Sequence, residues 1–145
     1  MGQDAIVQYV SETFEGVNIV VASEGLPAGD TFFIYDPHRD LPPKQQIPFA
    51  TIVTKDYGDF DNKSNLDRDG VWRLNIGLSR ETFRSLFPNT QADYDYTAVD
   101  TLMPHPVYAP QSFVCVLNPS EATFEKLKPL LKEAYTRAAG RRSAA

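Results

Sequence analysis

FATIVT (49–54) and VWRLNIG (71–77) are the stretches that decide the fold. Both are rich in β-branched and aromatic residues. Apolar and polar side chains alternate along the second, as in a strand with one apolar and one polar face. The polar, turn-rich residues 55–70 between them predict a long surface loop with a solvated cluster of acids. Strands that cluster in this way favour a mostly antiparallel sheet.

Three more segments have strand character, and three have the apolar spacing of amphipathic helices. The predicted strands are 18–23, 31–35 and 112–117, and the predicted helices are 4–14, 79–87 and 119–139. This order predicts an α+β domain with about five strands, mostly antiparallel, and with the helices packed on one face of the sheet. Residues 1–140 are expected to form this one domain, followed by a frayed tail over 141–145.

Local signals predict where the helices begin and end. Ser79 is expected to cap the middle helix, and Asn118 the last one, with a proline at its first position. Pro129 predicts a kink or a break in the last helix, because proline cannot donate the helical hydrogen bond. In the middle helix we expect the side chains of Phe83, Leu86 and Phe87 to point inward.

Composition bounds the class of protein. The chain has 145 residues, of which 42% are hydrophobic and 12% aromatic, which excludes a disordered chain. The acidic net charge of -5 argues against general binding to the phosphate backbone of nucleic acid. One cysteine, no signal-peptide pattern and no apolar run of ~18 residues favour a cytoplasmic protein without membrane contact.

Three blocks of the sequence resemble a known family. PFATIVTKDYGDFDNKSNLDR (48–68), GVWRLNIGLSRETFRSLF (70–87) and YDYTAVDTLMPHPVYAPQSFVCVLNPS (94–120) are similar to the bacterial domain-of-unknown-function family 6194. The closing strand and LLKEAY (130–135) resemble, more distantly, the MmcQ/YjbR-like proteins, whose fold is similar to that of CyaY. That second resemblance implies a compact α+β domain and suggests double-wing DNA binding.

Four residues form the candidate ligand site. Arg73 and Asn75 lie two positions apart on the polar face of one strand, so their side chains point the same way. His105 and Tyr108 belong to MPHPVYAP (103–110), where prolines stiffen the chain and would hold an imidazole in place. We expect one shared pocket if the two segments are neighbours. The alternative is that Arg73 pairs only with an acid such as Asp100 or Asp56.

Four further residues have side chains that could carry chemistry. Asp59 and Asp61 are candidate ligands for a hard cation, but their spacing fails as an EF-hand. His38 is expected at the surface. Cys115 is expected to be a small buried hydrophobe rather than a nucleophile.

No complete catalytic motif is present: there is no GxSxG, no GxGxxG and no P-loop. We therefore expect a non-catalytic binding or interaction module with a cleft near MPHPVYAP, no cofactor, and a small molecule or a protein as partner. One alternative is an enzyme acting on a small anionic metabolite, with His105 as acid/base and Arg73 as anion clamp. The other is a double-wing nucleic-acid-binding protein.

Overall fold

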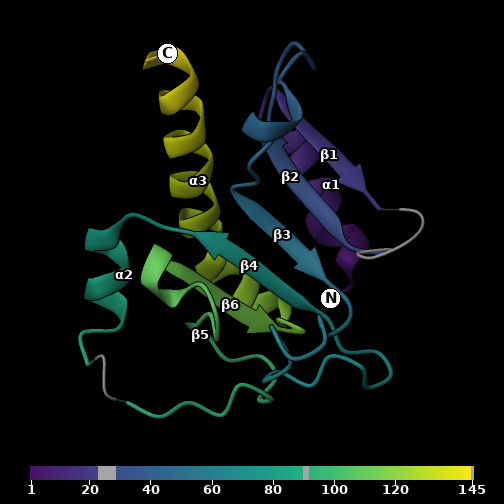
Figure 1. Cartoon of the computed structure of the whole chain (residues 1–145), viewed down its shortest axis with the longest axis vertical. Coiled ribbons are helices and arrows are strands. Elements are labelled where there is room, and N and C mark those ends of the chain that lie inside the picture. Colours follow the sequence, from purple (N-terminus) through teal and green to yellow (C-terminus); the bar gives the residue numbers. More distant parts are fainter. Residues whose placement is uncertain (23–28, 90–91, 145) are drawn as a thin grey trace.

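One antiparallel sheet of six strands organises the molecule (Figure 1), in the order β1-β2-β3-β4-β6-β5. The computed structural model describes residues 1–22, 29–89 and 92–144, the last of these by backbone alone from 142 onward. The strands are β1 (Val17–Val21), β2 (Thr31–Tyr35), β3 (Ala50–Val53), β4 (Arg73–Gly77), β5 (Met103–Pro104) and β6 (Phe113–Leu117). The α+β class and the antiparallel sheet are thus confirmed. The sequence predicted about five strands because β5 is only two residues long and lies in a proline-rich segment.

In the part of the chain that the structure describes, three α-helices accompany the sheet: α1 (Gln3–Thr13), α2 (Arg80–Leu86) and α3 (Glu121–Ala144). In Figure 1, α1 lies behind β1 and β2, while α3 passes behind β4. Two short 3-10 turns, η1 (Pro43–Gln45) and η2 (Ala109–Gln111), interrupt the loops. No helix in the described part of the chain is long and apolar enough to cross a membrane. Ser23, the last residue of the strand predicted over 18–23, lies outside the described residues.

The main core lies between the helices and one face of the sheet. Because side chains alternate along a strand, every second residue of β2, β3, β4 and β6 points at the helices. These residues pack with the apolar stripes of α1 and α3. The fully buried members are Ile6, Val10, Phe33, Ala50, Ile52, Leu74, Val114, Val116 and Leu131.

The opposite face of the sheet carries the other set of side chains, and loops cover it. Registered neighbours across the strands place Phe32, Thr51, Asn75, Cys115 and Met103 in one row. All five residues of β4 are buried, so its polar face does not meet bulk solvent. The expectation that 55–70 forms a solvated loop is therefore wrong in part. Its Asp61, Ser64 and Leu66 are buried, since the loop folds back over the sheet.

The start of α3 differs from the sequence prediction. The hydroxyl of Ser120, rather than Asn118, caps α3 by accepting from Thr123 N–H at 3.2 Å. Asn118 instead joins the strand ends, because its amide group bonds the backbone of Trp72 and Gly70.

Helix α3 also runs through Pro129 without dividing in two. The buried side chains of Leu127 and Leu131 on either side of this proline hold the helix against the sheet. Its backbone continues past Gly140 to Ala144. In α2, Ser79 is the cap, as predicted, and accepts from Thr82 N–H. Leu86 does not point inward: it is 39% exposed, because α2 packs through Phe83 and Phe87 alone.

Candidate functional site

Arg73 is the centre of a buried polar cluster on the loop-covered face of the sheet. Its side chain is 0% exposed. Asp61 receives Nη1–H at 3.1 Å and Nη2–H at 2.6 Å, which makes a two-pronged ion pair. Nε–H donates to Asn75 Oδ1 at 2.8 Å, and Nη1 also donates to Ser64 Oγ at 2.9 Å. A planar guanidinium with five donors suits such a surround, and a lysine could not replace it.

A tight turn brings Asp61 over β4. The backbone of Tyr57 and Asp61 forms an isolated antiparallel bridge, with Gly58 at a φ of +54° between them. The Tyr57 hydroxyl bonds the buried carboxylate of Asp30, which also accepts from Thr54 N–H at 2.8 Å. Burial, and secondarily the bond to Asp30, raises the pKa of the Tyr57 phenol. The turn is therefore tied to the start of β2 as well as to β4.

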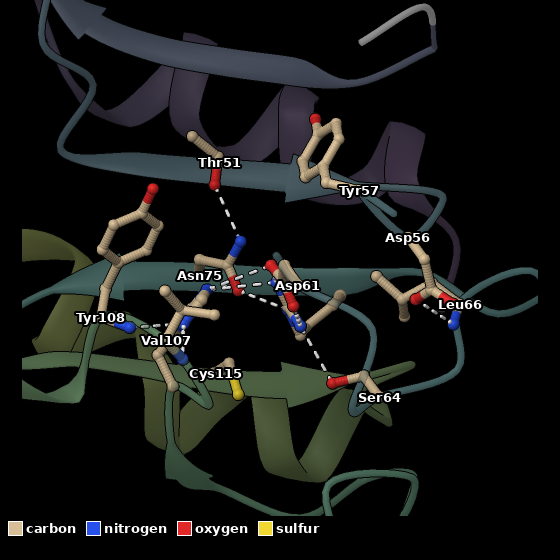
Figure 2. A network of polar contacts seen from close by, with 12 residues as sticks. Thr51, Asp56, Tyr57, Asp61, Ser64, Leu66, Asn75, Val107, Tyr108 and Cys115 are labelled. Carbon is tan, nitrogen blue, oxygen red and sulfur yellow. Dashed lines mark hydrogen bonds and ion pairs between the residues drawn. The ribbon is translucent and has the colours of Figure 1, made fainter. Parts of the chain in front are cut away.

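Asn75 continues the polar cluster across the sheet. Its Nδ2 donates to Thr51 Oγ1 on β3 at 3.0 Å, while its Oδ1 accepts from Arg73. Figure 2 shows Thr51 and Asn75 facing one another from adjacent strands. On the other side Asn75 is registered with Cys115, which is fully buried, as predicted. Burial raises the pKa of the Cys115 thiol to about 12.

His105 closes the cluster from the segment after β5. Its Nδ1 accepts from the backbone N–H groups of Val107 at 3.0 Å and Tyr108 at 2.9 Å, so the ring caps its own turn. Its Nε2 lies 3.1 Å from Arg73 Nη2 and 4.0 Å from Asp61 Oδ2. Burial and, to a smaller degree, the charge of Arg73 lower the pKa of His105 to about 3. The imidazole is neutral at physiological pH.

Above this cluster lies a pocket of about 440 Å³. Its walls are mostly apolar or aromatic, with Phe60, Ile47 and Tyr108 among the exposed ones. The rings of Phe60 and Tyr108 approach to 6.0 Å between centroids. In Figure 2, Tyr57 and Tyr108 stand on either side of the Thr51–Asn75 pair. Thr51, Asp61, Arg73, Asn75 and His105 are the polar residues that, with Tyr57 and Gln111, complete the lining.

The structure brings all four candidate ligand residues to this one pocket: Arg73, Asn75, His105 and Tyr108. Their neighbourhood depends on β4 and β5 both pairing with β6. The predicted pairing of Arg73 with Asp100 or Asp56 is wrong, because Asp61 is its partner. Asp100 accepts from Ser120 N–H at 2.7 Å, and Asp56 accepts from Leu66 N–H at 2.9 Å. Ligand binding by the four candidate residues stays a prediction.

The two candidate cation ligands, Asp59 and Asp61, lie in different environments. Asp59 is exposed on the turn, and Asp61 is buried against Arg73. Within the described residues no group of three or more His, Cys, Asp or Glu side chains could hold a metal ion. His38 is exposed, in line with the prediction.

The sequence did not reveal that Thr51 and Ser64 belong to the site, nor that Asp61 is the buried ion-pair partner of Arg73. One signal could have found the last: a buried strand arginine needs a counter-charge, and the adjacent loop is rich in aspartate. Which aspartate serves depends on the Tyr57–Asp61 turn, and no local pattern announces that.

Comparison with known proteins gives a family without an assigned activity. No curated protein and no solved structure matches the chain. The similarity to MmcQ/YjbR-like proteins and CyaY therefore stays a prediction. A family model described as a family of unknown function matches residues 1–145, and the chain belongs to this family, DUF6194.

Proposed function

We propose that this protein is a non-catalytic binding module that takes one small, mostly apolar molecule into the pocket above Arg73. The observation that carries the proposal is the contrast between the pocket's apolar walls and its buried, charge-paired polar floor. Pockets for small molecules are typically about 300–1,000 Å³, with apolar walls and a few fixed polar groups. At about 440 Å³ this pocket suits a molecule built around a single ring.

The pairing of Arg73 with Asp61 argues against the enzyme alternative. An anion clamp needs a free edge of the guanidinium group. Asp61 already occupies one edge, at 2.6 Å and 3.1 Å, and Nε on the other edge donates to Asn75. A proton-transfer catalyst works best with a pKa near the ambient pH, whereas that of His105 is lowered to about 3. The net charge of -5 does not favour the nucleic-acid alternative. A cytoplasmic setting fits the single buried cysteine.

Titration of the ¹⁵N-labelled protein with ethylbenzene, followed by amide shifts, tests the proposal. We expect saturable shifts at Thr51, Asn75 and Tyr108, which line the pocket from three segments of the chain. A second groove lies between α1 and α3 and is lined by Tyr9, Lys128 and Tyr135. Shifts that do not saturate, or that centre on this second groove, would contradict the assignment.

Matched variants locate the binding. Ile47 and Phe60 line the pocket but are 68% and 61% exposed, so removing both side chains should cost little stability. Ile47→Ala combined with Phe60→Ala should weaken ethylbenzene binding by about fivefold, from roughly 1 kcal/mol of lost apolar contact. Leu86→Ala is the control, because Leu86 is an exposed apolar residue outside this pocket. An equal effect of the control would refute the location.

A further inference from the structure

His105 is surrounded by hydrogen-bond donors. Two backbone N–H groups, of Val107 and Tyr108, approach Nδ1, and Arg73 Nη2 approaches Nε2. A neutral imidazole has one donor nitrogen and one acceptor nitrogen. One of the two ring nitrogens therefore meets a donor while carrying a proton itself. The ring cannot satisfy all three neighbours, and the choice of tautomer decides which contact is left unmade.

The backbone selects the tautomer. A proton on Nδ1 would face the N–H groups of both Val107 and Tyr108, which make these bonds at 3.0 Å and 2.9 Å. A proton on Nε2 conflicts only with one N–H of Arg73. Losing two bonds in a partly buried turn costs more than losing one, so the neutral ring carries its proton on Nε2.

The other donors of Arg73 do not relieve the conflict. Its Nε and Nη1 groups bond Asn75, Ser64 and Asp61, and Nη2 also donates to Asp61. Asp61 Oδ2 is 4.0 Å from His105 Nε2, too far for a hydrogen bond. The pair formed by His105 Nε2–H and the second N–H of Arg73 Nη2 thus lacks one acceptor. Both residues line the pocket.

We propose that the ligand of this pocket is an uncharged molecule that carries a carbonyl-type oxygen at its inner end, and that this oxygen accepts from His105 Nε2–H. This inference rests on the proposed binding function and names the ligand class. An acceptor oxygen beside His105 Nε2 would accept the hydrogen bond for which the protein itself provides no acceptor. A carboxylate fits less well, because Asp61 already neutralises Arg73, so the anion would lose its water without gaining a free counter-charge.

The tautomer is testable without a ligand. Long-range ¹H–¹⁵N correlation of the imidazole in the free protein at pH 7 should find the proton on Nε2 of His105. A proton on Nδ1 would overturn the inference and leave the proposed function intact.

Three single-ring probes then test the acceptor. Acetophenone has a carbonyl where ethylbenzene has a methylene group, and benzoate carries the same ring with a charge. His105→Asn is the informative variant, because its side-chain oxygen can still cap the turn while Nε2–H is lost. We expect this change to weaken acetophenone binding by about tenfold and ethylbenzene binding by less than twofold.

The outcomes separate the two proposals. If His105→Asn weakens both neutral probes equally, the acceptor inference is wrong and the pocket remains a binding site. If benzoate binds tighter than acetophenone to the wild type, the ligand class is wrong. If no probe binds, the proposed function fails and this inference fails with it. An amide spectrum of the variant shows whether it is folded; should it be unfolded, the tautomer measurement on the wild type decides.

Discussion

Breaking the Asp61–Arg73 pair should be among the most damaging single changes in the chain. Asp61→Asn removes the negative charge but keeps the size of the side chain, and it leaves the Arg73 guanidinium, 0% exposed, without a counter-charge. Removing one partner of a buried ion pair typically costs about 3–5 kcal/mol. For a chain of this length such a loss lowers the melting temperature by roughly 10–16 °C.

The magnitude follows from what remains around Arg73. Asn75 and Ser64 still accept two of its N–H bonds, but both are neutral, so they cannot offset a buried positive charge. Urea unfolding at pH 7 measures the free energy of unfolding through linear extrapolation. The control is Asp59→Asn, two residues away on the exposed part of the same turn. Its effect should stay within about 0.5 kcal/mol, as for surface changes in general.

A double-mutant cycle tests the reasoning rather than the site alone. Arg73→Met should be costly by itself, since it strands the Asp61 carboxylate in the same buried place. Combined with Asp61→Asn it removes both charges, so the double variant should lose at least about 2 kcal/mol less than the sum of the singles. Additive losses would refute the view that charge compensation is what the pair supplies.

Three further predictions concern other parts of the chain. Because the pKa of His105 is lowered from 6.5 to about 3, the unfolded chain binds a proton between these values that the native protein does not. Stability should then fall on acidification by about 1.4 kcal/mol per pH unit in that window, and urea unfolding at pH 7 and pH 5 should show a smaller fall for His105→Asn than for the wild type. Ser79→Ala removes the bond that Thr82 N–H makes to the capping hydroxyl, so we expect a loss of about 1 kcal/mol in the free energy of unfolding; Ser79→Asn, which can also cap and brings no charge near Glu133, should restore it. Cys115 is buried with its pKa raised to about 12, so a thiol-reactive probe should label the native protein far more slowly than the urea-unfolded protein, and equal rates would contradict the packing.

Local periodicity explains how much of the fold could be predicted. The strands and the first helix follow from spacings of two and of three to four residues, which a short window of sequence already contains. The same parity rule puts Arg73 and Asn75 on one face, and the structure keeps them there with a hydrogen bond between them. Errors arose where tertiary packing overrides a local signal. Buried neighbours hold α3 together across Pro129, and Leu86 stays exposed because α2 is too short to bury a wide face.

The site could be predicted only in part, for a related reason. His105 and Arg73 are far apart in sequence and meet because β4 and β5 lie on either side of β6. Nothing in a single sequence fixes that strand order. The role of Asp61 depends on the turn at Tyr57, and the row that contains Thr51 depends on the register of β3 against β4. Non-local pairing therefore sets the distances in the site that join one segment of the chain to another.

The polar cluster is hard to explain by folding alone. The helix-facing side of the same strands is filled with Leu74, Ile76 and Val114, which stabilise the sheet without desolvating any charge. Replacing a buried ion pair by apolar residues of similar size is often neutral or stabilising by about 1–4 kcal/mol. Asp61→Leu combined with Arg73→Met should therefore fold, with a free energy of unfolding near that of the wild type. If that double variant is stable and shows the preference for acetophenone over ethylbenzene that we expect of the wild type, the pair does not shape the pocket's chemistry. If it is stable and the preference is lost, the pair is retained for binding.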